Sequence, residues 1–137
     1  MANLTVPRAI QRGQGYIRPY KVAASTDILA GALVAVNAAG YAVNAADTAS
    51  TKVVGIADKT SKNTAGAAGA KTVRVWATGV IDLACASATQ AWVGQKVYAV
   101  DNQTVALAAT TTNDILVGVV TEFVSATKVF VALTPDA

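Results

Sequence analysis

The chain has 137 residues, a net charge of +3 at pH 7 and only 14% charged side chains, and one domain of this length buries about two thirds of its unfolded surface. It contains no histidine and a single cysteine, Cys85, which excludes an intrachain disulfide, a cysteine-rich metal site and any Ser-His or Cys-His catalytic pair. Valine and threonine are frequent, whereas glutamate occurs once, and this usage favours pleated sheets over helices. We therefore expect an all-β fold.

The first 22 residues predict an extended N-terminal arm, and residues 23–137 predict the β domain. Prolines and the Gly13-Gln14-Gly15 triplet break any periodicity in the arm, and residues 1–26 carry four basic side chains and no acidic one. Such an arm is either disordered or becomes ordered on a partner, for example by adding a strand to a sheet edge. In the second case its aromatic, apolar and basic side chains are the candidate contacts. They are Arg8, Ile10, Arg12, Tyr16, Ile17, Arg18, Tyr20 and Lys21.

Two hairpin patterns of the same design follow the arm, at residues 31–43 and 94–107. Each has an apolar run on either side of a turn rich in Asn, Asp or Gly, and residues 33–37 align with residues 97–101. Two later pairs of strands match as well, residues 53–56 with 116–119 and residues 72–75 with 128–131. We interpret the chain as two divergent copies of one β unit, residues 24–76 and 87–133, folded into a compact small β-barrel or a tulip-like β domain.

The segment 60–70, TSKNTAGAAGA, predicts a surface loop inserted into the first copy, because it is rich in glycine and alanine and lacks bulky apolar side chains. The two tryptophans, Trp76 and Trp92, are candidates either for the core or for a subunit interface. The alignment of Trp92 with Leu29 in the other copy favours a core position for Trp92.

No constellation of catalytic residues is visible in the sequence. The stretch TAGAAGAKT superficially resembles a phosphate-binding loop, but Ala70 separates the second glycine from Lys71 and a strand pattern follows. The aspartates are scattered, mostly at turns, and Cys85 lies among alanines as a small core residue would. We expect no enzyme activity, cofactor, metal or small-molecule substrate. We also see no apolar stretch for a membrane span or signal peptide, and expect synthesis in a cytoplasm.

A family resemblance is carried by the run LVAVNAAGYAVNAADTASTKVVGIADKTS and the following KTVRVWATGVIDL, which resemble tailed-phage head decoration proteins of the lambda type. The second half, from ATGVIDLACAS through GQKVYAVDNQTVAL to TKVFVAL, is similar to predicted capsid cement proteins of other tailed phages. The resemblance implies a β domain on the outer face of an expanded phage head, commonly a homotrimer, that binds and bridges major capsid protein subunits. By position, residues 1–22 would be the arm that ties these subunits together. No catalytic residue is implied.

Two other classes of function remain open from the sequence. A nucleic-acid-binding small β-barrel with a basic N-terminal tail would use the charges of the arm, although the slightly acidic remainder of the chain argues against nucleic acid as a partner. A head-fibre or receptor-binding module would bind cell-surface glycans instead of capsids.

Overall fold

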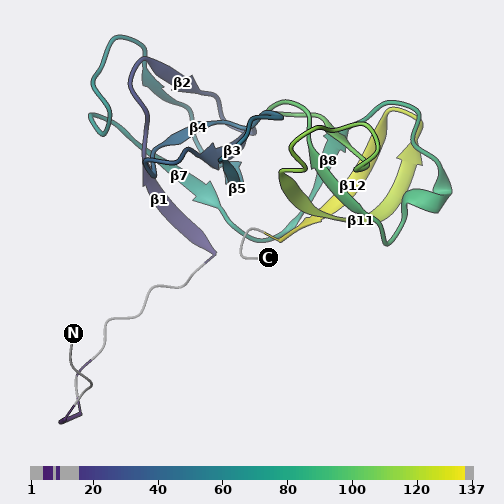
Figure 1. Cartoon of the computed structure of the whole chain (residues 1–137), viewed down its shortest axis with the longest axis horizontal. Coiled ribbons are helices and arrows are strands. Elements are labelled where there is room, and N and C mark those ends of the chain that lie inside the picture. Colours follow the sequence, from purple (N-terminus) through teal and green to yellow (C-terminus); the bar gives the residue numbers. More distant parts are fainter. Residues whose placement is uncertain (1–4, 8, 10–15, 135–137) are drawn as a thin grey trace.

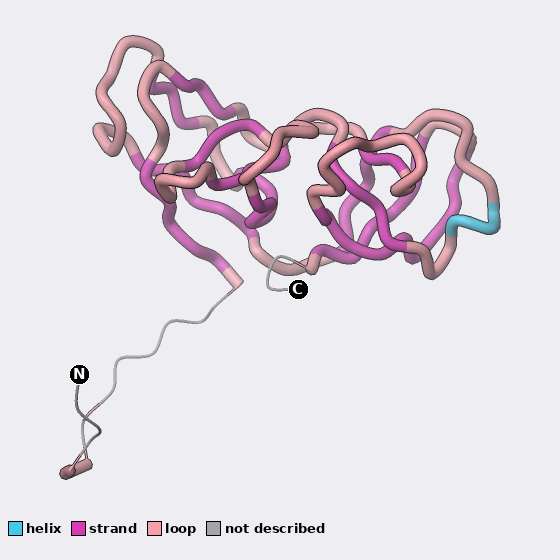
Figure 2. Tube along the Cα trace, in the orientation of Figure 1, coloured by secondary structure: helices cyan, strands magenta, loops and turns pink. Residues whose placement is uncertain are grey.

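The computed structural model describes residues 5–7, 9 and 16–134, and residues 16–134 form two β-rich lobes that lie side by side (Figure 1). Strands dominate, and the described part of the chain contains one short 3₁₀ helix, η1 (Gln90–Trp92), drawn in cyan in Figure 2. The all-β fold class is therefore confirmed. Residues 16–77 build the first lobe and residues 78–134 the second, so each lobe is one continuous segment of the chain.

The first lobe contains a five-stranded antiparallel sheet, here called the first sheet, with the strand order β1-β7-β5-β3-β4. Its strands are β1 (Ile17–Lys21), β3 (Leu33–Val36), β4 (Ala42–Asn44), β5 (Lys52–Ala57) and β7 (Thr72–Trp76). Two further short strands, β2 (Thr26–Ile28) and β6 (Ser61–Asn63), pair only with each other. Ile28 of β2 packs against the apolar side chains of the first sheet.

The second lobe contains another five-stranded antiparallel sheet, the second sheet, with the strand order β10-β9-β11-β12-β8. Its strands are β8 (Val80–Ala84), β9 (Lys96–Ala99), β10 (Val105–Ala106), β11 (Leu116–Ser125) and β12 (Lys128–Leu133). Figure 1 shows β11 and β12 as the long strands of this lobe.

The two sheets have the same strand order when β1, β7, β5, β3 and β4 are matched with β8, β12, β11, β9 and β10. Their registers agree as well, because Ile17 lies opposite Trp76 as Val80 lies opposite Ala132. From residue 17 to residue 57, each residue corresponds to the one 63 positions later. The chain therefore consists of two copies of one unit, and each copy begins one strand earlier than the sequence comparison indicated.

The strand pairing corrects the sequence alignment of the two hairpins by one residue. The sequence patterns of the two hairpins align Leu33 with Val97. The strand register instead matches Leu33 with Lys96 and Val34 with Val97. A shift of one residue moves every side chain of a strand to the other face of its sheet. The sequence could not fix this register, because Leu33, Val34 and Ala35 are all fully buried and show no alternation of apolar and polar residues.

Strand β1 lies inside the segment that the sequence predicted as an arm. It pairs with β7 along its whole length, and the Val22 N–H continues the ladder by donating to the Lys71 carbonyl at 2.9 Å. Pro19 obscures this strand in the sequence, because proline is rare within sheets. It is tolerated here because β1 is an edge strand and hydrogen-bonded pairs alternate along it, so Pro19 needs no donor toward β7.

The segment 60–70 is an insertion in the first copy, as predicted, but it has a fixed structure. It begins with β6, and the side chain of Asn63 is only 2% exposed. The Asn63 amide nitrogen donates to the carbonyl oxygens of Ala23 and Ala67, both at 3.0 Å. A buried amide with two backbone partners holds the segment in place.

Two hydrophobic clusters stabilise the lobes and join them. The first cluster lies within the first lobe and includes Val34, Val73 and Val75. The second cluster fills the second lobe and also includes Leu33 and Val53 of the first sheet. Because alternate residues of β3 face different clusters, the first sheet is buried on both sides along this strand.

Hydrogen bonds also cross the junction between the lobes. The Leu33 N–H donates to the Asn102 carbonyl at 2.7 Å. The Asp47 carboxylate accepts the N–H groups of Thr112 and Asn113, each at 2.8 Å, and the Asn113 side chain donates to the Asp47 carbonyl at 2.8 Å. These bonds, led by the one from Thr112, lower the pKa of Asp47 below its ordinary value, because they favour the ionised carboxylate.

Candidate functional site

An exposed face of the first sheet lies at its β1 edge. Side chains alternate along a strand, and directly opposite residues of an antiparallel pair share a face. The register of β1 and β7 therefore places one set of side chains together, which we call the β1–β7 face. Its members are Ile17, Pro19, Lys21, Thr72, Arg74 and Trp76.

Trp76 is held in a fixed orientation at one end of the β1–β7 face. Its indole ring stacks on the Tyr16 ring with centroids 6.2 Å apart and an interplanar angle of 17°. Its Nε1–H donates to the Asp58 carboxylate at 2.8 Å. Trp76 nevertheless remains 40% exposed, as does Tyr16. A rigid, half-exposed aromatic pair is a typical anchor for a protein interface.

The predicted partner-binding residues of the N-terminal segment fall into three groups. Arg8, Ile10 and Arg12 lie outside the described residues. Ile17 and Lys21 are members of the β1–β7 face, and Tyr16 adjoins it by stacking on Trp76. Arg18 and Tyr20 are half-buried on the other side of β1, in register with Val75 and Val73, and Tyr20 packs against the core of the first lobe.

The structure separates the two tryptophans that the sequence left undecided. Trp92 belongs to η1, is only 9% exposed and lies in the core cluster of the second lobe. It also lines an apolar cavity of about 360 Å³ together with Val100 and Val105. Trp76 is therefore the tryptophan that is accessible to a partner.

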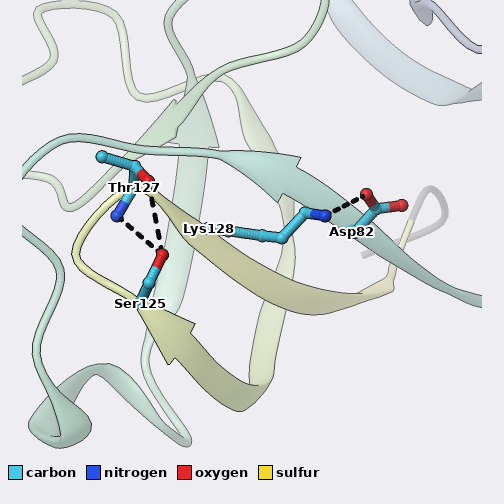
Figure 3. Close-up of polar contacts among 4 residues, drawn as sticks. All are labelled: Asp82, Ser125, Thr127 and Lys128. Carbon is cyan, nitrogen blue, oxygen red and sulfur yellow. Dashed lines mark hydrogen bonds and ion pairs between the residues drawn. The ribbon is translucent and has the colours of Figure 1, made fainter.

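The second copy presents the corresponding surface, which we call the β8–β12 face. Its members are Val80, Asp82, Ala84, Lys128, Phe130 and Ala132. Lys128 and Asp82 form an ion pair across the two strands at 3.3 Å, and both side chains are about half exposed (Figure 3). Figure 3 also shows Ser125 and Thr127 hydrogen-bonded in the turn before β12. Glu122 of β11 lies opposite Phe130 and extends this face.

The two lobes carry opposite net charge. Residues 16–77 contain seven lysines and arginines and three aspartates, whereas residues 78–134 contain two lysines and four acidic side chains. In the sequence, the excess positive charge is most concentrated in residues 1–26, which carry four basic side chains and no acidic one. Divided along the structural boundary, the basic charge extends over the whole first lobe.

The described residues offer no arrangement that indicates catalysis or metal binding. Within them, no group of three or more His, Cys, Asp or Glu could hold a metal ion. Cys85 is buried, its thiol donates to the Ala126 carbonyl at 3.7 Å, and burial raises its pKa. Two shallow hollows of about 340 and 290 Å³ lie at the junction of the lobes and share Gly31 and Gln103. None of the described residues forms a helix suited in length and hydropathy to a membrane span.

Arg74, Asp58 and the β8–β12 face were not among the candidate sites predicted from the sequence. A signal for Arg74 was present, since Thr72, Arg74 and Trp76 alternate with buried valines and must share one face. The neighbourhood of Asp58 and Trp76 depends on the β5–β7 pairing, which is a tertiary contact that no local pattern shows.

Comparison with known proteins gives one positive result. A family model described as "Phage cement protein" matches residues 10–135, which is most of the chain. No curated protein and no solved structure matches the chain.

Proposed function

Since the chain belongs to the phage cement protein family, we propose that it binds the outer surface of an expanded phage head and bridges neighbouring subunits of the major capsid protein. The family is structural, so the protein acts as a component of the virion capsid and not through catalysis. The observation that supports this proposal most strongly is the family match itself, because it spans both copies of the β unit.

The physical basis of cementing is mass action. A protein that binds the assembled, expanded lattice but not its separated subunits stabilises the lattice by the free energy of binding of each copy. Many copies add many such contributions, so modest contacts are sufficient. In this proposal the chain works as a homotrimer, which places several shell contacts on one particle and increases the avidity.

We assign the shell contact to the N-terminal segment that precedes Tyr16. The segment carries Arg8, Ile10 and Arg12, and it joins the folded lobe at Tyr16, whose ring is fixed on Trp76. Strand β1 then anchors the segment in the first sheet. A basic segment tied to a rigid sheet can reach a neighbouring capsid subunit while the lobe rests on another one.

The test is cosedimentation of the protein with expanded, undecorated shells from its own source. The full chain is compared with a chain that lacks residues 1–15, which keeps β1 intact. We expect the full chain to saturate the shells at a fixed ratio and the shortened chain to bind at least about tenfold more weakly. Circular dichroism checks that both chains are folded.

A matched pair of double variants separates the charge of the segment from charge in general. Arg8→Ala with Arg12→Ala removes two cations from the segment, and Lys59→Ala with Lys62→Ala removes two exposed cations from the first lobe. We expect only the first pair to weaken shell binding. Failure of the full chain to bind shells would overturn the proposal, and steeply salt-dependent binding to DNA would favour the nucleic-acid function.

A further inference from the structure

The two copies of the β unit differ most in the faces that they leave exposed. At corresponding positions, Trp76 replaces Ala132 and Arg74 replaces Phe130. Pro19 and Lys21 likewise correspond to Asp82 and Ala84. The β1–β7 face therefore combines an aromatic anchor with the cations Lys21 and Arg74. The β8–β12 face combines a half-buried phenyl ring with two carboxylates, Asp82 and Glu122, of which Asp82 is paired with Lys128.

The charges of the two faces are complementary. Asp82, Phe130 and Glu122 lie side by side across β8, β12 and β11, so the phenyl ring has a carboxylate on each flank. Asp82 already pairs with Lys128, but Glu122 is exposed and forms no ion pair within the described residues.

On the β1–β7 face, Arg74 and Lys21 are exposed, and neither forms an ion pair with another described residue. Asp58 follows β5 and lies opposite Arg74, because its N–H donates to the Arg74 carbonyl at 2.8 Å. Its carboxylate accepts the indole N–H of Trp76, so the face keeps a net positive charge from Arg74 and Lys21. Arg74 lies two residues from Trp76 on the same strand face. A guanidinium and an indole at this spacing match a carboxylate beside a phenyl ring, through ionic and aromatic contacts.

We propose that the β1–β7 face of one copy of this chain docks on the β8–β12 face of a second copy. Arg74 then meets Glu122, and Trp76 covers Phe130 and the exposed side chain of Val80. Because two different faces meet, the contact is heterologous, and its repetition closes into a ring when the rotation between copies allows it. The inference rests on the proposed function, in which the cement protein acts as an oligomer, and it names the surfaces that meet.

Disulfide trapping between copies in the absence of shells tests the contact directly. Every chain carries Cys85→Ala, and the chains carry either Arg74→Cys or Glu122→Cys. Mild oxidation of the mixture is expected to produce disulfide-linked dimers, whereas each chain alone is expected to remain largely unlinked. If the Arg74→Cys chain alone forms as much disulfide-linked dimer as the mixture, the contact is symmetric and the proposal is wrong. The absence of linked dimers in the mixture would also overturn the proposal.

Charge reversal gives an independent measurement. Analytical ultracentrifugation of Arg74→Glu and of Glu122→Arg should each show self-association weakened by about tenfold or more, since like charges then face each other. The double variant restores opposite charges and should recover most of the loss. The control Lys62→Glu makes the same change of charge on β6 of the first lobe and should leave self-association unchanged.

The two proposals can fail separately. If Arg74→Glu leaves self-association intact but abolishes binding to shells, the β1–β7 face is a shell contact and the copy-to-copy contact is wrong. If trapping succeeds but the chain does not bind shells, the oligomer stands and the capsid role fails.

Discussion

The first and second copies of the β unit share one backbone plan but complete it with different side chains. The same strand order recurs in both sheets, and even the loop bonds correspond: the Gly31 N–H donates to the Ala57 carbonyl as the Gly94 N–H donates to the Val120 carbonyl, at 2.9 and 2.8 Å. The first copy covers its core with the β2–β6 pair, whereas the second copy uses η1 and Trp92. The comparison indicates that pairing register is the conserved feature and that exposed faces are free to diverge.

The largest loss of stability is expected at Trp92, which occupies the position of Leu29 in the other copy. Trp92 is 9% exposed in the core, whereas Leu29 is 57% exposed. Trp92→Ala should lower the free energy of unfolding by about 3–5 kcal/mol because it leaves a large cavity. Leu29→Ala should change it by about 0.5 kcal/mol or less, as exposed substitutions do.

Urea unfolding followed by circular dichroism gives the free energy of unfolding of both variants. Circular dichroism is chosen because the Trp92→Ala variant lacks the fluorescence of Trp92. A similar loss of stability at both positions would contradict the view that the second copy alone uses this position to close its core.

A second prediction concerns the stability cost of adding a side chain at Gly55 and Gly118, which occupy corresponding positions in the two copies. A Cβ at either residue would collide with the carbonyl oxygen of the adjacent strand, that of Trp76 or of Ala132. Each Gly→Ala change should cost about 2–4 kcal/mol from steric overlap. Gly55 also has φ +146°, so Gly55→Ala should be the more destabilising of the two.

Gly40→Ala is the control for backbone conformation alone, because Gly40 has φ +87° but no atom near its Cβ position. Its cost should be about 1–2 kcal/mol. Thermal unfolding of the three variants shows which substitution destabilises the protein most and which least. If Gly118→Ala were as stable as the parent chain, the close packing of β11 on β12 would not be required for the fold.

Composition and turn chemistry were sufficient to predict the all-β fold, and the repeated strand patterns indicated the duplication without the first strand of each copy. The alignment with Leu29 favoured a core position for Trp92, but Leu29 itself is 57% exposed, so that argument does not explain the burial of Trp92. The strand β1 was missed because Pro19 and the polar residues around it give no strand pattern. The register of the hairpins was missed because Leu33, Val34 and Ala35 are buried on both sides of the sheet. The β8–β12 face was missed because its carboxylates, Asp82 and Glu122, are far apart in sequence and meet only through strand pairing.

The smallest expected effect concerns the junction between the two copies, where Asp47 of the first lobe holds the backbone of Thr112 and Asn113 in the second. The hydrogen bonds lower the pKa of Asp47 in the folded protein. The Asp47 carboxyl group therefore loses its proton more easily in the folded protein than in the unfolded chain. Its contribution to stability is therefore complete above the unfolded pKa of about 3.9 and disappears as the pH falls through the lower, folded value.

Asp47→Asn tests this junction by urea unfolding between pH 3 and pH 7. The parent chain should be more stable than the variant at pH 7, and the difference should shrink below about pH 4, where the Asp47 carboxylate of the unfolded chain begins to bind a proton. Asp82→Asn makes the same change of charge but disturbs only the exposed ion pair with Lys128, so its effect should be small. A difference between the parent chain and Asp47→Asn that persists unchanged at pH 3 would show that the junction depends on the shape of the side chain and not on its ionisation.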